Sequence, residues 1–247
     1  MLSAPLKACD DVTEESVDPS EVQRYFVKHG RYTAGTATKY KPSIISGEPA
    51  HQHLAKGLVI GMRFHSAPVI RLGRRQAGFA RAHDQGGRPL AAFAFSDRAD
   101  PAAPSSRLSA LCDFLVASPA SPFRKYTPAG ADIDSRDRCR APFSSRAIAS
   151  SACETMPSLL LPQKGRFGLR DYEKIFCPDL KSGNDVFDMR GIDRERGCLV
   201  AVRPDQYVAH VLPLDAFFGP FDVLRSVHAA KGLAADRHCC DRRSGPT

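Results

Sequence analysis

Residues 191–215 read GIDRERGCLVAVRPDQYVAHVLPLD, and they are the most informative stretch of the chain. It contains two short apolar segments rich in β-branched side chains, residues 198–203 and residues 207–212. Between these segments, Pro204 fixes its own φ angle, and Asp205 can hydrogen-bond the backbone two residues further on. Two apolar runs joined by turn residues predict a β-hairpin.

The N-terminal part of the sequence predicts one helix. Asp18 can accept hydrogen bonds as the N-cap, Pro19 is suited to the first helical position, and Glu21 completes a capping box. Gly30 is the expected end of the helix, in the left-handed conformation that glycine favours. The apolar side chains that then share one face are Val22, Tyr25 and Phe26. We expect this face to be exposed.

The middle of the chain predicts strands followed by a helix. Residues 58–60 and 69–70 are strand-like, and residues 90–95 (LAAFAF) are typical of a buried strand. The small-residue loop 99–106 leads into an amphipathic helix. The buried face expected for this helix consists of Leu108, Leu111, Cys112 and Leu115.

Four further stretches are similar in sequence to one enzyme family, in the same order along the chain. They are residues 29–40 (HGRYTAGTATKY), 53–72, 123–134 and 159–197. Together with the hairpin, they resemble the C-terminal portion of FAD-dependent aromatic hydroxylases of the phenol 2-monooxygenase and 3-hydroxybenzoate 4-monooxygenase type. The match covers far more of the chain than a short motif could.

The resemblance implies an α/β fold with four parts. Residues 58–218 correspond to the thioredoxin-like dimerisation domain that closes these hydroxylases. Residues 18–57 correspond to a helical remnant and linker from the end of the flavin and substrate domain. We expect residues 1–17 to be disordered and residues 219–247 to form an irregular, basic tail.

Residues 135–155 depart from the family pattern. They read SRDRCRAPFSSRAIASSACET, where the family continues with an apolar strand and an amphipathic helix. A divergent surface loop explains this departure, and so does a pair of compensating frameshifts. Both interpretations stay open.

The residues that carry flavin chemistry in such enzymes have no counterpart here. A Rossmann-like flavin domain needs a Gly-x-Gly-x-x-Gly turn, so that the backbone can approach a pyrophosphate at a helix N-terminus. That spacing does not occur in the sequence. FAD and NADPH therefore belong to the parent family. We expect this chain to bind neither alone, to hold no catalytic, cofactor-binding or metal-binding residue, and to be inactive.

Other clusters of reactive side chains have simpler interpretations. His51, His53 and His65 could seed a metal site, but no carboxylate lies at a useful spacing, which favours ordinary surface histidines. Disulfide chemistry needs Cys-x-x-Cys near a helix N-terminus, whereas Cys112 is alone in its predicted helix. Asp132 and Asp134 are interpreted as solvated carboxylates of a loop. Residues 238–240 (HCC) are interpreted as an incidental cluster in the tail.

Three polar residues of the hairpin are candidates for an interface: Arg203, Tyr207 and His210. Tyrosine and arginine are enriched at protein interfaces, although the same residues can merely cover a sheet face. The resemblance implies either a homodimer or a flavoprotein partner. The predicted function is therefore the dimerisation and support part of an aromatic hydroxylase. The alternative is a stand-alone thioredoxin-like interaction module that docks on a separate flavoprotein.

Composition narrows the choice of partners. Of the 247 residues, 43% are hydrophobic and 25% are charged, as in ordinary globular proteins. The net charge is +8, but the cations are scattered, so no nucleic-acid partner is predicted. No apolar run approaches a membrane span, and the start MLSAPLKACDD is not typical of a signal peptide. Eight irregularly spaced cysteines favour free thiols and a cytoplasmic location.

Overall fold

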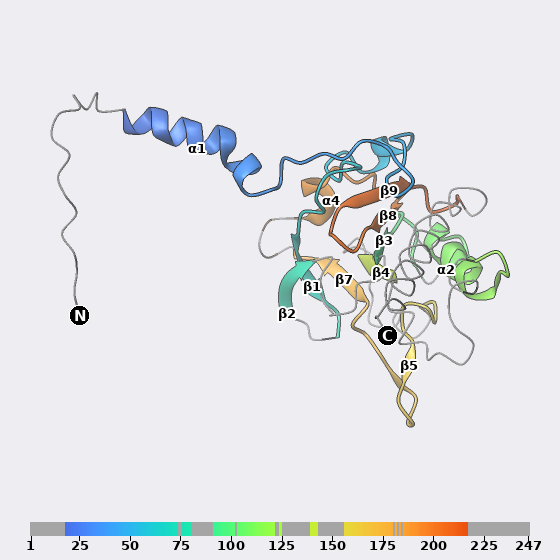
Figure 1. Cartoon of the computed structure of the whole chain (residues 1–247). Helices are drawn as coiled ribbons and strands as arrows, with labels where there is room; N and C mark the ends of the chain where they lie inside the picture. Colours follow the sequence, from blue (N-terminus) through green and yellow to red (C-terminus); the bar gives the residue numbers. More distant parts are fainter. Residues whose placement is uncertain are drawn as a thin grey trace, which may run out of the picture. The chain divides into compact units, whose positions relative to one another are not determined.

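The structure is a computed structural model that divides into two compact units, residues 1–38 and residues 39–247. It describes the following residues: 18–73, 76–80, 91–101, 103–121, 124, 139–142, 156–179, 181, 183 and 185–216. The predictions made for residues 1–17 and 219–247 lie outside these ranges. Figure 1 labels the helices and strands of both units.

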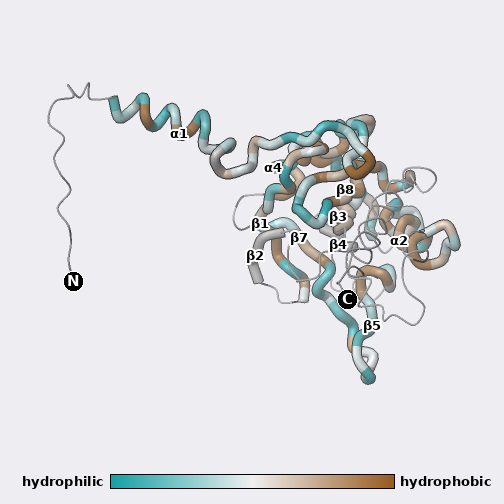
Figure 2. The backbone as a smooth tube through the Cα atoms, viewed as in Figure 1, coloured by the Kyte–Doolittle hydropathy of each residue, from teal (hydrophilic) through white to brown (hydrophobic). Residues whose placement is uncertain are grey.

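The first unit contains helix α1, Pro19–Thr33. The Asp18 carboxylate accepts a hydrogen bond from the backbone N–H of Ser20 at 3.0 Å, which confirms the predicted N-cap. The predicted end at Gly30 was wrong, because the helix continues through this residue for another turn. The left-handed residue is instead Gly35, with φ of 66°. Apolar and polar residues alternate along α1, as the colours of Figure 2 show.

The second unit is built on a seven-stranded sheet with the order β2-β1-β7-β4-β3-β8-β9. Strand β4 runs parallel to β3 and to β7, and the remaining neighbours are antiparallel. The strands are β1 (Ala67–Arg71), β2 (Gln76–Ala80), β3 (Ala91–Phe95), β4 (Cys139–Pro142), β7 (Ile175–Pro178), β8 (Cys198–Val202) and β9 (Val208–Leu212).

Smaller elements complete this unit. They are the 3-10 helix η1 (Gln52–Leu54), helix α2 (Arg107–Ala117), helix α4 (Val186–Met189), and a two-stranded ribbon of β5 (Gln163–Lys164) with β6 (Leu169–Arg170). The resulting class is mixed α/β. Helix α2 lies between the parallel strands β3 and β4 along the chain.

Several sequence predictions are confirmed. The hairpin is β8 and β9, residues 90–95 contain β3, and α2 buries the four predicted side chains. Strand β4 lies within the atypical residues 135–155, so part of that stretch belongs to the sheet.

The strand predicted at residues 58–60 was wrong, because these residues form turns. The N–H of Leu58 donates to the Ala55 carbonyl at 3.1 Å, and the N–H of Met62 donates to the Val59 carbonyl at 3.0 Å. Leu58 is nevertheless buried. A short apolar run therefore marked burial here without marking a strand.

The sheet is covered on both faces. In β3, Phe93 and Phe95 enter one core, whereas Ala92 and Ala94 enter the other, as the two-residue period of a strand requires. The first core also contains Phe187 of α4 and the buried side chains of residues 54–64, and the second contains α2 and residues 159–161. Strands buried on both faces are expected to be apolar throughout, and every residue of β8 and β9 is buried.

Residues 39–57 pack with the residues that follow them. Leu54, Ala55 and Leu58 are at most 1% exposed and belong to the first core. The N–H of Gly57 donates to the Arg190 carbonyl at 2.8 Å, and the N–H of Asp193 donates to the Leu54 carbonyl at 2.9 Å. This packing supports a domain boundary near residue 39.

Candidate functional site

The turn of the hairpin places its polar side chains on one side of the domain. The N–H of Arg203 donates to the Tyr207 carbonyl at 2.8 Å, and the N–H of Gln206 donates to the Arg203 carbonyl at 2.9 Å. Gln206 has a positive φ of 71°, and the register of the hairpin shifts between Ala201 and Val202. The turn is therefore tight, and Arg203 and Tyr207 lie opposite each other where it closes.

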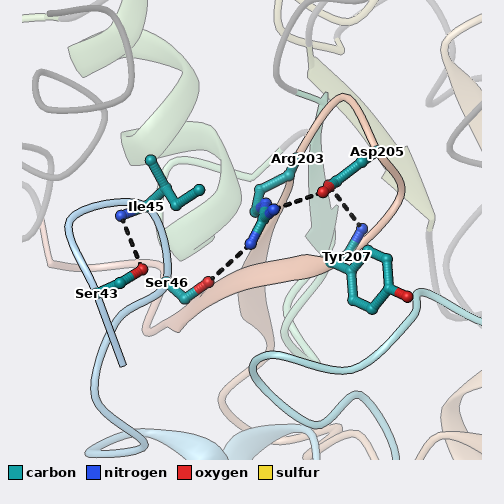
Figure 3. Close-up of polar contacts among 6 residues, drawn as sticks. All are labelled: Ser43, Ile45, Ser46, Arg203, Asp205 and Tyr207. Carbon is teal, nitrogen blue, oxygen red and sulfur yellow. Dashed lines mark hydrogen bonds and ion pairs between the residues drawn. The ribbon is translucent and has the colours of Figure 1, made fainter. Parts of the chain in front are cut away.

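Arg203 binds a segment that lies far away in the sequence. Its guanidinium lies 4.8 Å from the centre of the Tyr40 ring and 5.8 Å from that of Tyr207. It donates hydrogen bonds to the hydroxyl of Ser46, at 3.1 Å, and to the Asp205 carboxylate (Figure 3). Only 11% of the Arg203 side chain is exposed. We call Arg203, Tyr40, Ser46, Asp205 and Tyr207 the Arg203 clamp. A largely buried cation that contacts two aromatic rings and two oxygen acceptors stabilises the fold.

His210 holds the same segment one strand further on. It is 7% exposed, and its ring lies where a side chain at residue 47 would project: a Cβ on Gly47 would be 1.9 Å from the His210 Cε1 atom. The N–H of Gly47 donates to the Ala209 carbonyl at 2.9 Å. Glycine at position 47 therefore lets the chain pass directly over the imidazole.

The protonation of His210 is set by burial. Burial lowers the pKa of His210 from 6.5 to about 4, and its Nε2 atom has no hydrogen-bond partner among the described residues. The ring is consequently neutral at physiological pH. A neutral imidazole in this position packs against the chain and carries no charge to a partner.

The structure thus brings the three predicted interface residues together on residues 40–47. Their role in contacts with another protein stays a prediction. Sequence reasoning missed Tyr40, Ser46 and Gly47, which complete the site. The sequence offered only one weak signal for them, the Ser-Gly pair at 46–47, which is typical of a turn.

The depressed pKa of His210 predicts a dependence of stability on pH. Above pH 6.5 the ring is neutral in both states, and its contribution to the free energy of unfolding is complete. As the pH falls from 6.5 to about 4, the unfolded chain binds a proton that the folded chain does not, so stability falls. The loss from this group is at most about 3 kcal/mol.

Urea unfolding between pH 4 and pH 8 checks this expectation. His210→Gln is expected to flatten the wild-type slope between pH 4 and 6.5, because glutamine does not titrate there. His29→Gln, in the other structural unit, is the control and should keep the wild-type slope. Parallel curves for wild type and His210→Gln would contradict the assignment.

The structure describes all three histidines that were considered as a metal site, which are His51, His53 and His65. The rings of His51 and His53 are 6.2 Å apart and tilted. Within the part of the chain that the structure describes, no three His, Cys, Asp or Glu side chains gather closely enough to hold a metal ion. The other candidates, Asp132 with Asp134 and residues 238–240, lie outside the described residues.

Disulfide chemistry would need a cysteine at the N-terminus of α2, but the side chain bound there is the carboxylate of Asp97. Asp97 accepts hydrogen bonds from the Ser106 hydroxyl at 3.3 Å and from the Arg107 N–H at 3.2 Å. Cys112 is buried further along the helix. Because a carboxylate repels phosphate, the β3–α2 connection does not fit the pyrophosphate of FAD. Burial also raises the pKa of Cys198, so this thiol is unreactive.

These observations define a mixed α/β domain whose polar residues hold its own segments together. The chain belongs to the family "Phenol hydroxylase, C-terminal dimerisation domain", which matches residues 38–226 and has a thioredoxin-like fold. Within the described residues, no helix combines the length and apolarity that crossing a membrane requires.

Two curated proteins illustrate the relationship. The chain is 51% identical, over 218 residues, to the 3-hydroxybenzoate 4-monooxygenase of Comamonas testosteroni, and this match covers 87% of the chain but 33% of that protein. It is 34% identical, over 216 residues, to the FAD-dependent monooxygenase terD of Aspergillus terreus, covering 83% of the chain and 34% of that protein. The chain therefore spans about a third of the length of these relatives.

Proposed function

We propose that this chain is the dimerisation and support part of an FAD- and NADPH-dependent monooxygenase that hydroxylates phenolic aromatics such as 3-hydroxybenzoate. The observation that carries the proposal is the family match over residues 38–226, together with 51% identity to a 3-hydroxybenzoate 4-monooxygenase. The flavin and the substrate are held by another part of the assembly. This chain supplies self-association and a rigid support, and alone it is inactive.

In this proposal, the chain before residue 39 leads to the flavin part, and residues 40–47 anchor that connection on the domain. The Arg203 clamp and His210 fix residues 40–47 to the edge of the sheet, so the connection enters the domain at a defined place. A connection that a desolvated arginine fixes to the domain restricts the movement of the flavin part relative to this domain more than a flexible linker would.

A second candidate is a stand-alone module that docks on a separate flavoprotein. It is favoured by the apolar side chains of α1, which no other described element of the first unit covers: Tyr25 is 63% exposed and Phe26 is 67% exposed. Exposed aromatic side chains on one helix face are typical of a binding surface.

One experiment tests the proposed function. The purified 247-residue chain is mixed with FAD, NADPH and 3-hydroxybenzoate, and NADPH oxidation is followed at 340 nm. We expect no oxidation beyond that of a mixture without protein, and a dimer in sedimentation equilibrium. Oxidation stimulated by 3-hydroxybenzoate would contradict inactivity, and a monomer at all concentrations would contradict the role in dimerisation. Capture of a flavin-binding protein by a monomeric chain would favour the second candidate.

A further inference from the structure

A short β-ribbon projects from the second unit as an arm. It consists of β5, β6 and the tip between them, residues 163–170, and it extends away from the sheet in Figure 1. Gly165 and Gly168 both have positive φ, of 66° and 61°, and allow the tight tip. Phe167 at this tip is 75% exposed, and Leu169 beside it is 69% exposed.

The arm is hydrophilic except for these two side chains. Figure 2 shows mostly hydrophilic positions along it. At its base, Lys164 is paired with Asp171 at 2.6 Å. At its tip, the Arg166 guanidinium lies 4.7 Å from the centre of the Phe167 ring, and Arg166 makes no ion pair with a described residue. The tip therefore presents one aromatic ring next to one unpaired cation.

The same unit carries a hollow suited to such a ring. It lies between α2 and the residues before the arm and has a volume of about 200 Å³. Its lining residues are Cys112, Asp113, Val116, Ala117, Pro157, Ser158 and Leu159. This volume exceeds the roughly 150 Å³ in which an enclosed apolar cavity holds a benzene ring, and the hollow is open to solvent, so a ring can enter from outside. Asp113 also lines the hollow, is exposed, and makes no ion pair with a described residue.

The arm and the hollow are complementary. The arm offers an aromatic ring with an adjacent cation, and the hollow offers mainly apolar walls with the Asp113 carboxylate among its lining residues. Leu159 of the hollow is four residues before Gln163 of the arm, so the two features lie at most about 14 Å apart along the chain. Since Phe167 is exposed, it does not fill the hollow of its own chain.

We propose that two copies of this chain exchange their arms: Phe167 of each copy enters the α2 hollow of the other, and Arg166 pairs with Asp113 of the other copy. This inference rests on the proposed role in dimerisation and assigns it to particular residues. A twofold axis makes such a contact twice, with the same residues in both directions. A desolvated aromatic anchor at each contact is the kind of residue that dominates binding energy.

Sedimentation equilibrium of the full chain tests the exchange. Phe167→Ala is expected to raise the dimer dissociation constant at least 100-fold, because both contacts lose their ring. Arg166→Asp and Asp113→Arg are each expected to raise it at least tenfold, and the double variant is expected to return it to within threefold of wild type. Circular dichroism and urea unfolding establish that each variant is folded.

Matched controls separate the specific pair from a change in net charge. Arg196→Asp and Glu48→Arg change the charge by the same amounts at exposed residues and should leave the dissociation constant unchanged. A wild-type dimer that the arm variants do not weaken would overturn the exchange and leave the proposed function standing. Failure of the double variant to recover would overturn the pairing of Arg166 with Asp113. A monomeric wild type would overturn both proposals.

Discussion

Gly197→Ala is expected to lower the free energy of unfolding by about 2–5 kcal/mol, which is a large share of the stability of one domain. Gly197 immediately precedes β8 and has φ of 62°. A Cβ there would lie 2.4 Å from the Phe95 carbonyl oxygen and 2.7 Å from the Asp97 nitrogen. Because both atoms belong to the backbone at the end of β3, neither can move without displacing the centre of the sheet.

Gly183→Ala is the matched control for this prediction. Gly183 also has a positive φ, of 71°, but a Cβ there would have no atom of a described residue within 4 Å. Gly183→Ala is therefore expected to lower the free energy of unfolding only by the conformational term, about 1–2 kcal/mol. Urea unfolding, followed by circular dichroism, compares the two variants with wild type. Equal losses at both positions would show that close packing around Gly197 contributes nothing.

Local sequence patterns predicted the elements whose causes are local. The two apolar, β-branched runs and the Pro-Asp turn predicted the hairpin, and the spacing of Leu108 and Leu111 predicted the buried face of α2. The end of α1 was missed because glycine also adopts the right-handed helical conformation: α1 runs through Gly30 to Thr33, and the left-handed residue is Gly35. Residues 58–60 were mistaken for a strand because their burial comes from turns that pack into the core.

The candidate site was predictable only in part. Arg203, Tyr207 and His210 are polar residues in an otherwise apolar hairpin, and that contrast is visible in the sequence. Ser46, by contrast, meets Arg203 across 157 positions of the chain. No periodicity predicts a contact at such a separation, and the role of Gly47 depends on where the His210 ring lies. Long-range partners of this kind require the three-dimensional structure.

Arg203→Ala is expected to lower the free energy of unfolding by about 3 kcal/mol. The change removes two hydrogen bonds of a charged group and two contacts with aromatic rings. It also leaves the hydroxyl of Ser46, which is fully buried, without its donor. Arg203→Lys keeps the charge but cannot make the same fork of hydrogen bonds while stacking on the rings, so it should recover less than half of the loss.

Hydrogen exchange locates the effect within the domain. In wild type, the amides of Tyr40 and Gly47 are bonded to Gly61 and Ala209, at 2.8 and 2.9 Å. In Arg203→Ala, these two amides are expected to exchange faster by a larger factor than the amides of α2, because the clamp holds residues 40–47 and not the core. Arg196→Ala, at an exposed residue, is the control. Uniform acceleration across the domain would mean that Arg203 stabilises the whole fold without selectively fixing the connection, and the proposed role of the clamp would then be wrong.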